Sequence, residues 1–96
     1  MREGMILEHD YERKAEILKA IAHPVRLCII HGLLQEEECN VSKMQNCLEV
    51  PQSTVSQHLA KLKAAGIVEG KREGVEIYYR IVDKEVKKII QGLFEE

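Results

Sequence analysis

Aromatic residues are scarce in this chain of 96 residues, which contains one Phe, three Tyr and no Trp. A hydrophobic core must therefore be built mainly from aliphatic side chains, which are available because 45% of the residues are hydrophobic. A chain of this length lies near the lower limit at which one core is sufficient, and such domains often complete their core by oligomerising. The sequence therefore predicts one small aliphatic domain over residues 1–96.

Several other features are missing, and each absence excludes a class of protein. No hydrophobic run approaches the length of a membrane span, and the N-terminal MREGMILEHDYERK lacks the apolar stretch of a signal peptide. The three cysteines (Cys28, Cys39 and Cys47) are odd in number and show no Cys-x-x-Cys spacing, which argues against a secreted disulfide framework. No glycine-rich phosphate loop or nucleophile–base arrangement is recognisable. We therefore expect a cytoplasmic protein that is not an enzyme and needs no cofactor.

Charge of one sign is not in large excess, but it is unevenly distributed. The net charge is -2, and residues 1–50 carry nine acids against six bases. Residues 51–82 carry five bases against three acids, a net charge of +2. This asymmetry is modest, and it is consistent with a polyanionic partner for the second region.

Hydrophobic residues recur at helical spacing in five segments, approximately 9–22, 24–34, 41–48, 52–65 and 83–96. Asp10 and Asp83 are the expected N-caps of the first and last helices, and Gly66 is expected to end the fourth in a left-handed conformation. The apolar residues of the first helix are Tyr11, Ala15, Leu18 and Ala22, widened by Ile17 and Ile21. Those of the last are Val86, Ile89, Ile90, Leu93 and Phe94. An apolar face this broad needs a partner, either within the domain or on a second chain.

After Gly66 the hydrophobic period changes from helical to alternating. Ile67–Glu69 is expected to begin a strand, Lys71–Gly74 to form a turn, and a second strand to follow. The inward-facing residues of that second strand are predicted to be Val75, Ile77, Tyr79 and Ile81. The fold class is therefore mainly α-helical, with five helices and one two-stranded hairpin.

The short helix 41–48, a tight turn and the polar-faced helix 52–65 have the order of a helix-turn-helix, and the hairpin 67–82 would form its wing. Short polar side chains near a helix N-terminus can approach base edges and phosphates in the major groove of DNA. The candidate readers and positioners are Gln52, Ser53, Thr54, Ser56, Gln57 and His58. The candidate phosphate contacts are Lys61, Lys63, Lys71 and Arg72. The competing interpretations are a plain solvated helix surface and, for His58, a cap on a neighbouring helix or a position facing the core.

The run STVSQHLAKLKAAGIVEGKREGVEIYYRI, with IAHPVRLCII before it, closely resembles the ArsR/SmtB family of bacterial repressors. The resemblance extends from about residue 16 to residue 94. It implies a dimeric winged-helix protein that binds operator DNA and releases it when an inducer, often a metal ion, binds. It also implies a homodimer that pairs through the first and last helices.

The metal sites known in the family are incomplete in this sequence. One uses a Cys-x-Cys pair at the start of the helix after the acidic connection, where this chain has only Cys39, one position early. The other uses Asp and His near the start of the last helix and further His or Glu along it, but no His follows residue 58. Cys28 and His31, three residues apart, could form another site with Cys39, although a buried thiol and a surface imidazole are the favoured interpretation. No metal site is therefore predicted.

A thiol switch is the alternative input. A disulfide needs alpha-carbons within roughly 7 Å, whereas Cys39 and Cys47 would lie about 12 Å apart along an ideal helix. Cys47 is expected in the core, and the thiolate of Cys39 is disfavoured by the acidic connection around it. Metal, oxidant, persulfide and no input at all remain open, as does a winged helix that contacts only other proteins.

Overall fold

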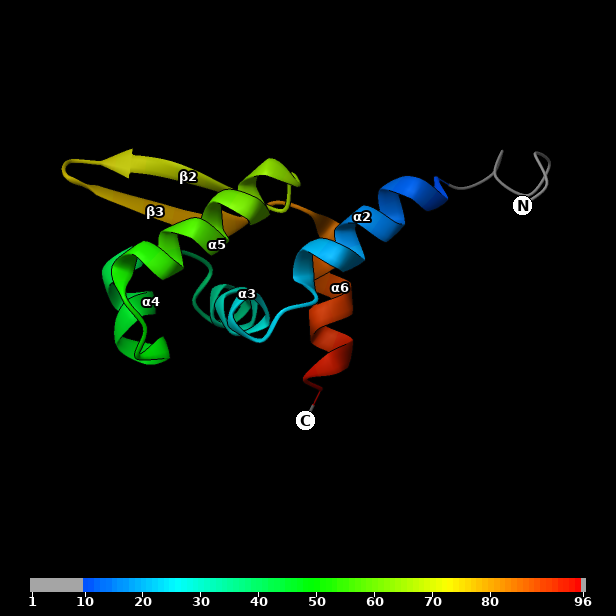
Figure 1. Ribbon diagram of the computed structural model, residues 1–96, viewed down its shortest axis with the longest axis horizontal. Coiled ribbons are helices and arrows are strands. Elements are labelled where there is room, and N and C mark those ends of the chain that lie inside the picture. Colours follow the sequence, from blue (N-terminus) through cyan, green and yellow to red (C-terminus); the bar gives the residue numbers. More distant parts are fainter. Residues whose placement is uncertain (1–9, 96) are drawn as a thin grey trace.

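The computed structural model describes residues 10–95, with the side chains of residues 46 and 47 outside the description (Figure 1). The elements in chain order are α2 (Tyr11–Ile21), α3 (Pro24–Glu36), β1 (Cys39–Asn40), α4 (Val41–Leu48), α5 (Gln52–Ala64), β2 (Val68–Glu73), β3 (Glu76–Ile81) and α6 (Lys84–Leu93). The five predicted helices are confirmed within one or two residues at most ends. No single described helix is long and apolar enough to cross a bilayer. Together α2 and α3 would have the length and composition, but the chain bends by 96° between them.

Both predicted N-caps are present. Asp10 Oδ1 accepts a hydrogen bond of 2.9 Å from the Arg13 N–H, and Asp83 Oδ1 accepts one of 3.0 Å from the Val86 N–H. The predicted helix end at Gly66 is also confirmed, since its φ of +75° lies in the left-handed region that glycine tolerates best. Local sequence signals therefore set several boundaries of the helices.

Helix α3 occupies the centre of the molecule and contacts α2, α4, α5, α6 and β3. Its buried side chains are Ile29, Ile30 and Leu33. The predicted core stripe of α5, made of Val55, Leu59 and Leu62, is confirmed and is at most 1% exposed. Val86 and Ile90 of α6 complete this aliphatic core with no exposed surface.

The predicted two-stranded hairpin is confirmed as β2–β3, but a third strand that was not predicted joins it, giving an antiparallel sheet in the order β1-β3-β2. Strand β1 pairs Cys39 with Tyr79, and this pairing buries Cys39 to 8% exposure. The expectation that Cys39 lies in an acidic loop is therefore corrected. A strand of two residues shows no hydrophobic alternation, which is why the sequence pattern did not reveal it.

The hairpin turn also differs from the prediction. Strand β2 continues through Glu73, which pairs with Glu76, so the turn consists of Gly74 and Val75 rather than Lys71–Gly74. Gly74 has a φ of +67°, which a two-residue hairpin turn requires, and Val75 is 93% exposed at the tip instead of facing inward. Only Val68 of β2 is buried, so most of this strand carries no apolar signal.

Helix α2 presents two apolar faces. Ile17 and Ile21 are buried against the core, whereas Tyr11 is 40% exposed and Leu18 is 53% exposed. Ile17 and Ile21, which were predicted only to widen the apolar face, are therefore the residues that pack on the core. The residues predicted as the main apolar stripe are exposed, namely Tyr11, Ala15, Leu18 and Ala22.

Substitution of Gly66 and Gly92 tests whether the first is left-handed and the second helical. A Cβ at Gly66 would require a left-handed residue and would lie 3.3 Å from Arg13 Nη2, whereas one at Gly92 meets no atom within 4 Å. We expect Gly66→Ala to lower the free energy of unfolding by about 1–2 kcal/mol. Gly92→Ala, within α6, should raise it by up to about 1 kcal/mol. Urea denaturation measures both, and effects of the same sign would contradict the assignment.

Candidate nucleic-acid interface

The outward face of α5 carries most of the residues predicted to contact DNA. Of the predicted residues on this helix, Gln52, Ser53, Ser56, Gln57, Lys61 and Lys63 are exposed, whereas Thr54 and His58 are half-buried. Residues three and four positions apart on a helix lie on the same side, so Ser53, Ser56 and Gln57 form one continuous polar surface. It lies opposite the buried stripe that fixes α5 to the core.

The N-terminus of α5 differs from those of the other described helices. Asp10, His23, Asn40 and Asp83 each provide a side-chain acceptor at the start of α2, α3, α4 and α6. Helix α5 begins after Pro51, which makes no such hydrogen bond. The Thr54 and Val55 N–H groups donate to the Pro51 carbonyl, so those of Gln52 and Ser53 are available to an anion such as a phosphate, which the helix dipole also favours.

Helix α4 packs on α5, and the turn between them includes Glu49 in a left-handed conformation with a φ of 57°. The Glu49 N–H donates a hydrogen bond of 2.9 Å to the Gln45 carbonyl, which closes α4 before the chain turns. This helix–turn–helix unit brings the start of α5 to the surface. The hairpin β2–β3 contacts α5 and extends past α4, at the end of the molecule away from α2 (Figure 1).

The two cations predicted on the wing occupy consecutive positions in β2. Lys71 pairs with Tyr78 and Arg72 pairs with Ile77, and both cations are exposed. Because successive side chains in a strand point to opposite faces, Lys71 and Arg72 lie on different sides of the hairpin. A DNA duplex beside the wing would therefore meet them from different directions.

His58 is turned toward the start of α3. Its ring centroid lies 4.4 Å from that of His23, and its Nδ1 accepts a hydrogen bond of 3.3 Å from Arg26 Nε. Arg26 Nη1 also donates to the Ala20 carbonyl at 2.8 Å. Burial lowers the pKa of His58, and the nearby charges of His23, Arg26 and Lys61 lower it further. His58 therefore joins α5 to α3 near the helix that would meet DNA.

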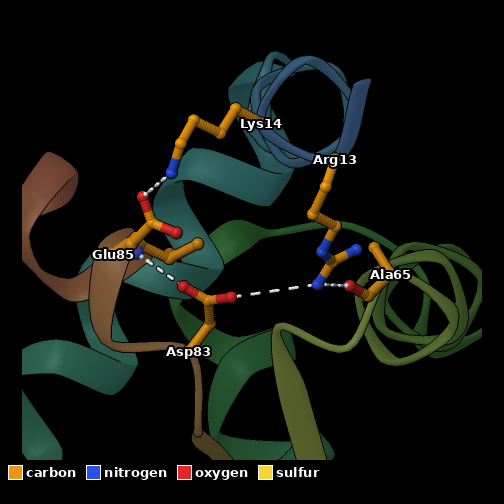
Figure 2. Close-up of polar contacts among 6 residues, drawn as sticks. Arg13, Lys14, Ala65, Asp83 and Glu85 are labelled. Carbon is orange, nitrogen blue, oxygen red and sulfur yellow. Dashed lines mark hydrogen bonds and ion pairs between the residues drawn. The ribbon is translucent and has the colours of Figure 1, made fainter. Parts of the chain in front are cut away.

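Arg13 of α2 contacts the C-terminal end of α5 (Figure 2). Its Nη2 donates a hydrogen bond of 2.7 Å to the Ala65 carbonyl and lies 3.9 Å from Asp83 Oδ2. Lys14 forms an ion pair of 2.8 Å with Glu85, which raises the pKa of Lys14. Sequence reasoning gave Arg13 no role. Its signal was a cation in the first turn of a helix, where the dipole disfavours positive charge and a partner is needed.

The candidate sensing residues are dispersed. Cys28 is exposed on α3, so the expectation of a buried thiol was wrong: Ile29, Ile30 and Leu33 form the buried face of this helix. Cys39 is buried in β1, and the half-buried ring of His31 stacks on Phe94 with centroids 3.9 Å apart. The side chain of Cys47 lies outside the described residues, so its expected core position stays a prediction and its pairing with Cys39 stays an open alternative. Among the side chains that the structure describes, no group of three His, Cys, Asp or Glu residues is placed to hold a metal ion.

The three-helix core, the exposed polar α5 and the hairpin beside it define a winged helix-turn-helix protein. A family model described as a helix-turn-helix domain matches residues 21–71. The chain is 44% identical over 91 residues to the transcriptional repressor PagR of Bacillus anthracis, covering 95% of this chain and 87% of that protein. The PagR crystal structure matches with a TM-score of 0.79, over 85% of this chain and 93% of that one.

Two further relatives agree. The repressor SmtB of Mycobacterium tuberculosis is 45% identical over 75 residues, which are 78% of this chain and 55% of SmtB. The structure of HlyU from Vibrio cholerae matches with a TM-score of 0.85 at 33% identity, over 94% of this chain and all (100%) of that one. The chain belongs to the ArsR/SmtB family of winged-helix transcriptional regulators. The resemblance noted from the motifs is thereby confirmed, and the family is one of regulators rather than enzymes.

The environment of His58 predicts a pH-dependent stability. Its pKa in the folded protein lies below the ordinary 6.5, so the unfolded chain binds the proton more readily. The stability that depends on neutral His58 is thus present above about pH 6.5 and is lost as the pH falls through the lower, folded-state pKa. Urea unfolding at about pH 7.5 and 5.5 should show a smaller loss in His58→Gln than in the unchanged protein. Equal losses would contradict this role of His58.

Proposed function

We propose that the protein is a transcriptional repressor that binds a two-fold symmetric operator as a homodimer and inserts α5 of each subunit into a major groove. The observation that carries the proposal is the exposed polar face of α5 above an N-terminus without a side-chain cap. Residues 41–65 would be the helix-turn-helix, residues 67–82 the wing, and α2 and α6 the dimer helices. The relatives named as repressors, PagR and SmtB, support this role.

The division of labour on α5 follows from its chemistry. Gln52, Ser53, Ser56 and Gln57 would read bases and position the helix, because their donors and acceptors are short and exposed. Thr54 and His58 are half-buried, so they contribute at the edge of this surface. The phosphate contacts would be Lys61, Lys63, Lys71 and Arg72. A repressor that binds operator DNA in this way would act in the cytoplasm.

The dimer is supported by the exposed apolar surface. Four of the six exposed large hydrophobic residues in the described part of the chain belong to α2 and the end of α6. They are Tyr11, Leu18, Leu93 and Phe94. An open groove of about 150 Å³ between these helices is lined in part by Ile17, Leu18 and Ile89. To enter successive major grooves, the two α5 helices of such a dimer would have to lie one DNA turn, about 34 Å, apart.

Two substitutions on α5 should separate affinity from specificity. Lys61→Ala removes a phosphate contact, so it should weaken binding to every duplex and reduce the salt-dependence slope by about one unit. Gln57→Ala removes a base contact, so it should reduce discrimination between promoter and scrambled DNA by about 1–3 kcal/mol. Fluorescence anisotropy on DNA upstream of its own operon measures both, and Lys88→Ala on α6 is the matched charge control.

Two outcomes would contradict these proposals. If the unchanged protein shows no salt-dependent binding to any duplex, the winged helix serves only protein contacts. If Lys61→Ala and Gln57→Ala change cognate and scrambled DNA equally, the proposed division of roles on α5 is wrong.

The dimer surface can be tested with one charge. Leu18→Glu places a carboxylate on the 53%-exposed apolar face of α2, and it should convert the dimer to monomer by raising the dissociation constant at least tenfold. Val75→Glu adds the same charge at the hairpin tip and should leave the dimer intact. Sedimentation velocity distinguishes the two species. A Leu18→Glu protein that remains dimeric would place the dimer contact on another surface.

A further inference from the structure

A cavity of about 140 Å³ lies between α3, β1 and α4. Its inner surface is hydrocarbon and sulfur, contributed by Ile29, Leu33, Cys39, Met44 and Leu48, with the thiol of Cys28 nearer the exterior. Thiol and thioether groups behave as weakly polar, hydrophobic surface. The cavity is thus apolar on the sides supplied by all three elements.

The entrance to the cavity has a different chemistry. Lys43 Nζ and Glu36 Oε2 form an ion pair of 3.3 Å, and both residues line the cavity and are exposed. Cys28, Gly32 and Glu36 follow one another at intervals of four residues, so they form one edge along α3. A Cβ at Gly32 would meet no atom within 4 Å, which leaves this part of the edge open.

The lining excludes the more polar occupants. Among the described side chains, no buried nitrogen or oxygen lacks a hydrogen-bond partner, so the inner part of the cavity offers no unpaired side-chain atom to an ordered water or an anion. The polar lining residues Gln35, Glu36 and Lys43 are exposed. No group of three potential metal ligands occurs among them either. An apolar cavity of about 150 Å³ in an engineered protein remains dry and binds benzene, which sets the size of a fitting molecule.

We propose that this cavity is a binding site for a small apolar molecule with the dimensions of benzene or toluene. The molecule would contact α3 and β1 on one side and Met44 and Leu48 of α4 on the other, and would therefore stabilise the position of α4. Because α4 packs on α5, this site adjoins the helix-turn-helix. The binding step itself does not depend on the proposed DNA-binding function.

Toluene is the probe for this site. In a titration followed by methyl NMR, the signals of Ile29, Leu33, Met44 and Leu48 should shift and saturate with a Kd of about 1 mM, as expected for a ligand of this size. The melting temperature should rise with toluene concentration, because the ligand binds the folded state. Neither measurement requires DNA, so a failure here leaves the repressor proposal untouched.

Gly32→Leu should occupy the open edge of the cavity and weaken toluene binding at least tenfold. Gly32→Ala is the matched control, since it makes the same change in backbone freedom but adds one carbon, and it should retain most of the affinity. Cys28→Leu obstructs the same edge one turn earlier, so it replaces Gly32→Leu if that variant does not fold. Thermal unfolding without ligand reports the folding of each variant.

Three results would overturn the proposal. One is the absence of saturable shifts in the unchanged protein. Another is binding that is undiminished in Gly32→Leu and Cys28→Leu, which would place toluene outside the cavity. The third is a set of shifts confined to Leu18 and Ile89, which would show that toluene binds the exposed apolar face of α2 and α6.

Discussion

The burial of Val55, Leu59 and Leu62 against the central helix α3 is the interaction on which the rest of the molecule depends. These side chains are at most 1% exposed, and their spacing determines which side of α5 faces inward. The polar side chains between them must then face outward. The same aliphatic packing that stabilises a small domain without large aromatic residues therefore also creates the surface offered to DNA.

Polar contacts at the middle and at the C-terminal end of α5 then define how this helix is held. His58 accepts a hydrogen bond from Arg26 of α3, and the carbonyl of Ala65 accepts one from Arg13 of α2 (Figure 2). Arg13 also lies near Asp83, which caps α6. Helix α5 is consequently connected to α2 and, through Arg13 and Asp83, to α6, which carry most of the exposed apolar residues.

The sequence was most informative where a structural requirement is local. The apolar spacing of α5, the caps Asp10 and Asp83, and the left-handed Gly66 each depend on a few neighbouring residues, and each was predicted correctly. Strand β1 was missed because its only signal is pairing with β3, which is distant in sequence. The hairpin turn was misplaced because β2 extends away from the core and lacks inward apolar residues.

The candidate DNA-binding residues could likewise be predicted only where local sequence determines their position. The exposed polar face of α5 followed from the position of its core stripe, so most candidate residues could be named in advance. The direction of His58 depends on where α3 begins relative to α5, and the role of Arg13 depends on the end of a helix 52 residues away. The local hydrophobic periodicity contains no information about either of these contacts between distant segments. The cavity beneath α4 likewise exists only once three separate elements have packed.

The start of α5 after Pro51, without a side-chain acceptor, has a consequence for the protein before it meets DNA. The Thr54 and Val55 N–H groups both donate to the Pro51 carbonyl, so within the first turn only the N–H groups of Gln52 and Ser53 gain no intramolecular bond. If α5 enters a groove as proposed, a phosphate oxygen would accept from these two groups and complete the hydrogen bonding of the turn. An aspartate in place of Pro51 would supply an acceptor within the chain, but its negative charge would repel the phosphate backbone. The proline thus leaves the acceptor for these groups to be supplied by the partner.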